Sequence, residues 1–327
     1  MMSEAKLKQR LWNFLEGRGY KVGGEVKVVP DEKIKVIRKE RLKQLEGLPP
    51  LELFGLSIPR SWKRVSYKID LVSFDGNEFV GYEVKSRFED LSSGYFWDQM
   101  ECYAKGEMLD RLFLVFHDGK CIHGAHGREY EHILASYKHA LKEAGIGLIV
   151  LENDNFTVKL EAKKLNRMYN PKLEKNEAWL RHKVWNYFES LDFEVEGEVK
   201  ILGKNTRIAK GRIDLALLPK GVDLATVAHK QDKYDHIGIE VKYGIRGRGE
   251  LFKIKNQLDS YVYSGCFTKV YLLVRERDVW VVNEIKKIYD RKFGVMIFFQ
   301  DKEIVEEYLE APKLNMRLNA MNYISYV

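Results

Sequence analysis

The sequence predicts two tandem α/β domains, each built on a mixed β-sheet with helices on both faces. Three observations support this. The 327 residues are enough for two domains of ordinary size. One order of elements, helix, three strands, helix, strand, helix, strand, can be read twice along the chain. Segments of the first half also recur in the second, at one constant separation near the start of each half and at a second one further along, which is typical of a duplicated domain.

The separation between matching segments near the start of each half is 173 residues. Residues 12–16 (WNFLE) align with residues 185–189 (WNYFE), and residues 24–27 (GEVK) align with an identical segment. We therefore expect three parts: a first domain over 1–161, a linker over 162–176 and a second domain over 177–327.

The elements of the first half follow from hydrophobic periodicity and turn residues. Ser3 is a helix N-cap candidate, and Asp75-Gly76-Asn77 is a strong hairpin turn. An insertion at about 30–63 has no counterpart in the second half. The expected elements are a helix at 4–16, strands at 20–29, 66–74 and 78–86, a helix at 95–109, a strand at 112–116, a helix at 129–144, and strands at 147–151 and 155–160.

The second half repeats this order, with a longer polar connection between its second and third strands. Lysine and asparagine cluster around Pro171, which favours a linker before the repeat starts. The expected elements are a helix at 174–191, strands at 193–202, 212–218 and 237–243, a helix at 250–263, and strands at 270–274 and 294–299 with a helical stretch between them.

Composition predicts an ordered intracellular protein. Hydrophobic residues make up 45% of the chain, and no apolar run of the roughly 18 residues needed to span a membrane is present. The charged N-terminus is unlike a secretory signal, so we expect a cytoplasmic protein with no membrane partner. The three scattered cysteines exclude a disulfide framework and a four-cysteine metal site. The net charge of +7 is compatible with a polyanionic partner.

One pattern of charged residues occurs in each half: an aspartate on an apolar strand, then Glu-Val-Lys on the next strand. The hairpin would bring two carboxylates and one amine together. Carboxylate oxygens suit a hard divalent cation, and the ammonium suits a developing negative charge, so the pattern predicts phosphodiester cleavage. A single such triplet would more often be a solvated strand, but its duplication in matching context favours a site. The members are Asp70, Glu83 and Lys85 in the first half, and Asp214, Glu240 and Lys242 in the second.

With these motifs, each half resembles the PD-(D/E)xK nuclease superfamily. A Gln-x-x-x-Tyr motif on the following helix, Gln99 with Tyr103 and Gln257 with Tyr261, resembles its RecB-like branch. Both side chains of each pair share one helix face and can point at the site. The resemblance covers nearly all of both halves outside the insertion and the last residues. It implies tandem restriction-endonuclease-like domains. The chain departs from the family in having Ile-Asp in place of Pro-Asp, and it lacks the cysteines of the iron–sulfur members.

The resemblance also implies residue roles. Each aspartate and glutamate would hold Mg²⁺ or Mn²⁺, and Lys85 and Lys242 would orient the attacking hydroxide or stabilise the transition state. Glu4 and Glu177 are either a further metal carboxylate or acids that complement the helix dipole. The remaining candidate metal ligands are the backbone carbonyls of Val84 and Val241 and the rival carboxylates of Glu25 and Glu198.

The sequence therefore predicts a metal-dependent nuclease acting on nucleic acid, DNA in the first instance. Arg246 and Arg248, in a glycine-rich segment after the second Glu-Val-Lys, are candidates for phosphate contacts. We expect a monomer that acts as an intramolecular pseudo-dimer. The alternatives are a catalytically degenerate DNA-binding or structural module, and a subunit of a repair or defence complex.

Overall fold

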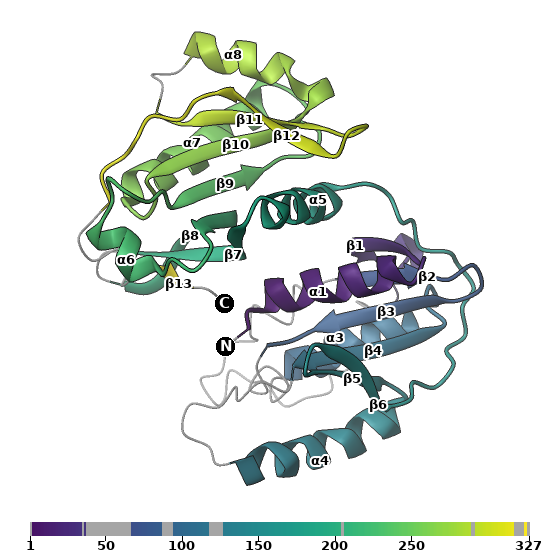
Figure 1. Cartoon of the computed structure of the whole chain (residues 1–327). Coiled ribbons are helices and arrows are strands. Elements are labelled where there is room, and N and C mark those ends of the chain that lie inside the picture. The colour runs from purple at the N-terminus through teal and green to yellow at the C-terminus, as the bar shows by residue number, and fades with distance from the viewer. Residues whose placement is uncertain are drawn as a thin grey trace, which may run out of the picture. The chain divides into compact units, whose positions relative to one another are not determined.

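The computed structural model describes residues 2–34, 36, 67–86, 94–117, 127–203, 206–288, 292–316 and 324–325. The chain divides into two compact units, Met1–Glu174 and Lys175–Val327. Each unit is α/β, with one mixed sheet flanked by helices (Figure 1). The predicted fold class is confirmed at that level.

The first unit holds a six-stranded sheet in the order β1-β2-β3-β4-β5-β6. The β3–β4 and β4–β5 pairs are parallel, and the other pairs are antiparallel. Its elements are α1 (Glu4–Gly17), β1 (Lys21–Lys27), β2 (Lys68–Phe74), β3 (Phe79–Val84), α3 (Gly94–Lys105), β4 (Arg111–His117), α4 (Gly127–Ala144), β5 (Gly147–Glu152) and β6 (Asn155–Leu160).

The second unit repeats this topology in a seven-stranded sheet of order β12-β11-β10-β9-β8-β7-β13. Again only the two central pairs, β9–β10 and β10–β11, are parallel. Its elements are α5 (Glu177–Ser190), β7 (Phe193–Gly203), β8 (Thr206–Pro219), α6 (Leu224–His229), β9 (Ile237–Val241), α7 (Arg248–Ser264), β10 (Lys269–Arg275), a 3₁₀ turn (Glu276–Asp278), α8 (Trp280–Ile288), β11 (Gly294–Phe299), β12 (Ile304–Leu309) and β13 (Ile324–Ser325).

The first helix of each unit starts at a polar N-cap. The Ser3 side chain accepts a hydrogen bond from the backbone N–H of Lys6, and the Asn176 side chain accepts one from Trp179. Such caps satisfy amide groups that the first helical turn leaves without partners. As a result Glu4 lies in the first turn of α1, and its counterpart lies in the first turn of α5.

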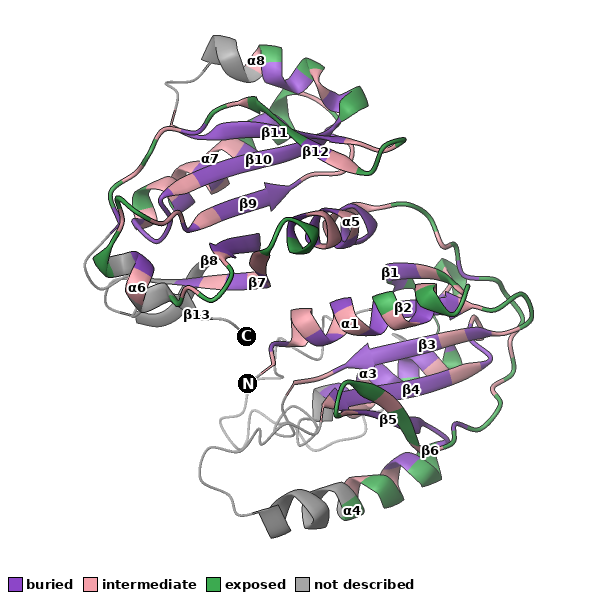
Figure 2. Cartoon of the chain, viewed as in Figure 1, coloured by how far each residue is buried: buried purple, intermediate pink, exposed green. Residues whose placement is uncertain are grey.

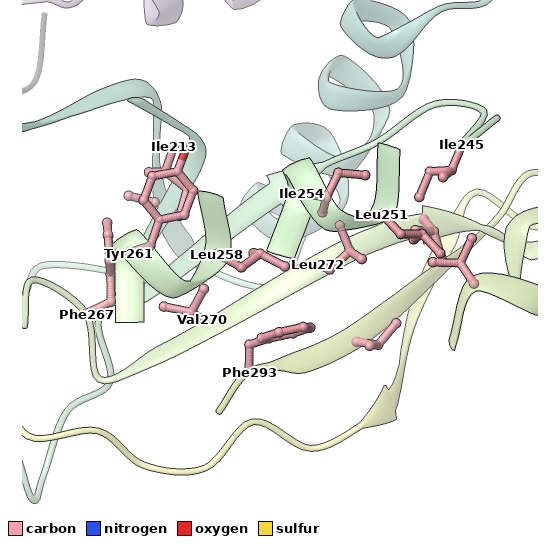
Figure 3. Packing of buried hydrophobic residues seen from close by; sticks show 14 of the residues in the cluster. Ile213, Ile245, Leu251, Ile254, Leu258, Tyr261, Phe267, Val270, Leu272 and Phe293 are labelled. Carbon is pink, nitrogen blue, oxygen red and sulfur yellow. The ribbon is translucent and has the colours of Figure 1, made fainter. Parts of the chain in front are cut away.

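The central strands are buried along most of their length (Figure 2). Parallel strands need helices on both faces, which is why they are apolar throughout rather than alternating. In the second unit α7 contributes apolar residues at helical spacing to one core cluster, packed against Val270 and Leu272 of β10 (Figure 3). These helix residues are Leu251, Ile254, Leu258 and Tyr261.

Three elements of the second unit were not predicted. Strand β12 is an edge strand in which Glu306 and Glu307 interrupt the apolar residues, so it lacks a regular apolar pattern. Strand β13 is two residues long and pairs with β7. Helix α6 lies in the polar connection before β9, and Asp223 caps it. Strand β8 begins at Thr206, six residues before the predicted start, and the other boundaries agree with the predicted elements to within four residues.

The predicted linker was too long. Most of residues 162–173 pack onto the first unit, where the carbonyl of Ala162 accepts a hydrogen bond from Arg111 and Arg167 pairs with Asp110 at 2.7 Å. The division between the units falls after Glu174, inside the predicted linker. The predicted insertion at about 30–63 lies almost entirely outside the described residues.

No helix in the described ranges is long and apolar enough to cross a membrane.

Candidate active sites

In the first unit, the β2–β3 hairpin brings the predicted aspartate and glutamate together. The register pairs Leu71 with Tyr82, so Asp70 and Glu83 are the next residues on the two strands. The backbone N–H of Val84 donates to Asp70 Oδ2 at 2.8 Å. The Lys85 ammonium lies 2.7 Å from Glu83 Oε1.

The second unit repeats this arrangement. The backbone N–H of Val241 donates to Asp214 Oδ2 at 2.8 Å. The Lys242 ammonium lies 2.6 Å from Glu240 Oε1 and 3.9 Å from Asp214 Oδ2. Glu177, on the first turn of α5, lies 3.6 Å from the same ammonium. Each hairpin therefore holds two carboxylates around one lysine, as the sequence predicted.

A cation on the first helix also reaches each site, and sequence reasoning missed it. Lys8 Nζ lies 2.8 Å from both Glu4 Oε1 and Asp70 Oδ1. Arg181 lies 3.2 Å from Asp214 Oδ1. Lys8 and Arg181 are separated by the same 173 residues as the other matching positions, which could have identified them.

Burial and neighbouring charge shape the carboxylates of the first site. Burial alone would raise the pKa of Asp70, but Lys8 and Lys85 outweigh it and hold that pKa below its usual range. Burial, together with the charge of Asp70, raises the pKa of Glu83 to about 8. The two carboxylates raise the pKa of the Lys85 ammonium against the effect of burial. Because the pKa of Asp70 is lowered and that of Glu83 is raised, a single proton shared by the two carboxyl groups belongs mainly to Glu83.

The second site has the same electrostatic character. Burial raises the pKa of Glu240 to about 8, and the charge of Asp214 adds to the effect. Burial opposes the charged form of Lys242, but the surrounding carboxylates outweigh it and raise the lysine pKa.

Two carboxylates fit a divalent cation in each unit, but the described residues contain no ready cluster of three. No group of three His, Cys, Asp or Glu side chains in the described ranges is placed to hold a metal. Within the same ranges, Glu240 Oε2 is buried without a hydrogen-bond partner. Burying a carboxylate oxygen without a partner costs folding free energy. A divalent cation would supply the partner, since carboxylate oxygens are suitable ligands for Mg²⁺ or Mn²⁺. The donor set therefore fits a metal with two protein carboxylates and water as the remaining ligands.

The Gln-x-x-x-Tyr pairs hold the aspartate strand. Burial raises the pKa of Tyr261, and the neighbouring Glu240 carboxylate adds to that effect, so this tyrosine also lies beside the second site. Gln257 Nε2 donates to Tyr261 Oη at 2.7 Å, and the Tyr261 hydroxyl donates to the carbonyl of Arg212 at 2.6 Å. Gln99 and Tyr103 make the same contact, and Tyr103 donates to the carbonyl of Lys68 at 2.6 Å. Both tyrosines are almost wholly buried. Each fixes the strand two residues before the aspartate, which makes these residues positioning groups.

Glu25 and Glu198 adopt an unusual backbone conformation at the same place in both sheets. Their φ angles are +51° and +54°, a region that favours glycine. The register on either side places each of them opposite the aspartate of the neighbouring strand. The Glu198 carboxylate lies 3.6 Å from Arg181 and 3.0 Å from Arg212. Glu25 is exposed.

The two predicted phosphate-contacting arginines are exposed beside the second site. The Arg246 backbone N–H donates to Glu250 at 2.7 Å, and the Arg246 residue is exposed. Arg248 pairs with Glu284 of α8 at 3.1 Å, so any phosphate would have to compete with that carboxylate.

No protein-family model matches the chain, and no curated protein does. Among solved structures, a protein of unknown function from Silicibacter pomeroyi aligns over 46% of this chain and 80% of its own length, at 13% identity and a TM-score of 0.30. A likeness at this level carries no argument about fold or function.

Proposed function

We propose that the chain is a metal-dependent nuclease that hydrolyses phosphodiester bonds in nucleic acid, DNA in the first instance. We also propose that its two units are restriction-endonuclease-like domains of the RecB-like branch. One observation carries the proposal. Asp, Glu and Lys come together twice, with the same amide bond to the aspartate and lysine–glutamate distances of 2.7 and 2.6 Å.

Each residue of the two sites has a distinct role in the proposed reaction. In each unit the aspartate and glutamate would hold Mg²⁺ or Mn²⁺, which when bound lowers the pKa of a water and neutralises charge on the phosphate. Lys85 and Lys242 keep a positive charge beside the carboxylates, where it can stabilise an anionic transition state. The tyrosine on the following helix fixes the aspartate strand, so the two acids keep their separation.

A nucleic-acid-binding module that does not cut is the second candidate. It is favoured by the cations on α1 and α5, which already satisfy one oxygen of each aspartate. The two candidates differ in their response to metal.

The deciding experiment incubates purified protein with labelled duplex, single-stranded and junction DNA, and with RNA, in Mg²⁺, Mn²⁺ or EDTA. Cleavage that needs the metal and is lost in the Asp70→Asn/Asp214→Asn double variant supports the nuclease. A gel shift without cleavage under every metal condition would support the binding module instead.

A further inference from the structure

A lysine or arginine one turn into the first helix pairs with the aspartate of the site in both units, and the proposed chemistry assigns no role to either cation. Lys8 and Asp70 have side chains 21% and 17% exposed, and Arg181 and Asp214 have side chains 17% and 14% exposed. Pairs this sheltered are screened little by salt. They are therefore part of the site's electrostatics rather than surface ion pairs of negligible energy.

The contacts leave the two aspartate oxygens with different partners. Oδ2 of Asp70 accepts the Val84 amide, and Oδ1 faces Lys8. In the second unit Oδ2 accepts the Val241 amide, and Oδ1 faces Arg181. The backbone bond is fixed by the hairpin, whereas the cation is at the end of a long side chain. Oδ1 is the oxygen whose partner can change.

Each cation also has a second acid to hold it near the site. Lys8 is 2.8 Å from Glu4, one turn earlier on the same helix. Arg181 is 3.6 Å from Glu198, the left-handed residue opposite the aspartate. If the aspartate takes another partner, the cation therefore stays beside the carboxylate pair, where a phosphate oxygen would attract it.

We infer that Lys8 and Arg181 compete with the divalent cation for their aspartates and, once it is bound, contact a phosphate of the nucleic acid. The inference rests on the proposed function, because it needs a metal and a polyanionic substrate at this site. Each of these two cations would then have two opposite effects: the cation weakens metal binding and strengthens binding of the nucleic acid.

The first measurement is Mn²⁺ binding to the full chain without nucleic acid, by calorimetry. Removing a unit charge next to a metal ligand should tighten binding at that site by roughly tenfold or more, from Coulomb interactions at contact distance. We expect tighter Mn²⁺ binding at the first site for Lys8→Met and at the second site for Arg181→Met. Lys8→Arg should bind Mn²⁺ as the wild type does.

The matched controls remove the same charge from the same helices away from the sites. Arg10 on α1 pairs with Asp154, and Lys183 on α5 lies 3.4 Å from Glu303. Arg10→Met and Lys183→Met should leave Mn²⁺ affinity unchanged. Thermal unfolding of every variant shows whether the fold is retained.

The second measurement is duplex binding at several salt concentrations with Ca²⁺ in place of Mn²⁺. Loss of one phosphate contact should reduce the slope of log affinity against log salt by about 0.9. We expect that reduction for Lys8→Met and Arg181→Met, and no change for Lys8→Arg.

The possible results distinguish a failure of this inference from a failure of the proposed function. A wild type that binds no Mn²⁺ overturns the proposed metal-dependent function, and the inference with it. A wild type that binds Mn²⁺ while Lys8→Met and Arg181→Met bind it equally or more weakly overturns the inference alone. An unchanged salt slope in folded variants also overturns it.

Discussion

At the scale of single residues, the two sites are defined by buried glutamates whose protonation is coupled to folding. The pKa of both Glu83 and Glu240 is raised to about 8 by burial and a neighbouring aspartate. A carboxyl group whose pKa is raised in the folded state adds to the free energy of unfolding, and this contribution is complete below the group's ordinary pKa of about 4.5. That stability is lost as pH rises through about 8, because the folded state holds the proton more tightly than the unfolded state.

We therefore predict that the metal-free protein becomes less stable between pH 5.5 and pH 7.5, at up to about 1.4 kcal/mol per pH unit for each glutamate. The Glu83→Gln/Glu240→Gln variant, which cannot lose those protons, should show a shallower slope. Urea unfolding in EDTA at both pH values measures the difference. Equal slopes for the two proteins would mean that neither glutamate is protonated in the folded state.

The buried tyrosine hydroxyl is a second feature at this scale. We predict that Tyr261→Phe lowers the free energy of unfolding by about 1–2 kcal/mol, because the Arg212 carbonyl and Gln257 lose a buried partner. Tyr263, two residues further on the same helix and 60% exposed, provides the control. Tyr263→Phe should change stability by less than about 0.5 kcal/mol. Similar losses in both variants would contradict the positioning role.

At the scale of elements, the first strand of each sheet holds a glutamate in a conformation that L-residues avoid. In strand β1, Glu25→Gly should relieve about 1 kcal/mol of backbone strain. Glu25→Ala removes the same side chain but keeps the strain, so it isolates the backbone term. We predict that the glycine variant is more stable than the alanine variant by about 1 kcal/mol in chemical unfolding. Equal stability would show that the strand relaxes around residue 25.

Most elements could be predicted because their physical causes are local. Apolar periodicity, the Ser3 cap and the Asp75-Gly76-Asn77 turn each act within a few residues, and the structure has the hairpin with Asp75 accepting from two following amides. Strand β12 could not be predicted in this way, because Glu306 and Glu307 break the alternation of apolar and polar residues that marks a half-buried strand.

The site was only partly predictable for a related reason. The aspartates, glutamates and lysines were found because they recur in one order along the sequence. Lys8 and Arg181 were missed because a cation four residues after an acid is an ordinary helix pair. Their separation of 173 residues marks them as matching positions, but only the packing of a helix on a sheet shows that such a residue reaches a strand. The positive φ angle of Glu198 could not be predicted either, because glutamate has no preference for that backbone conformation.

At the scale of the whole molecule, the chain carries two complete sets of candidate catalytic groups. We predict that Asp70→Asn and Asp214→Asn each leave partial metal-dependent cleavage, and that the double variant has none. Single-variant rates relative to wild type, with thermal unfolding as the check on folding, measure this. A single variant without activity would assign a binding role to the other unit.

The two sites also define how a supercoiled plasmid should be cut if the chain acts as an intramolecular pseudo-dimer. We predict conversion directly to linear product under single-turnover conditions, because a covalent tether keeps the second site at high effective concentration. The single-site variants should produce nicked circles instead. Long accumulation of nicked circles by the wild type would mean that the sites act separately.

The left-handed glutamate shared by both sheets also orders events in the history of the chain. Two units that share the order of six strands, and whose sequence segments match at separations of 173 and then 158 residues, are typical of a duplicated domain. A strained position common to both halves was inherited from the ancestral domain, so it is older than the duplication. Within the described residues strand β13 pairs with β7, and the insertion at about 30–63 has no counterpart in the second half of the sequence, so the two halves came to differ at these places after the duplication. The exchange of lysine for arginine between positions 8 and 181 falls in the same later period, when the halves began to differ.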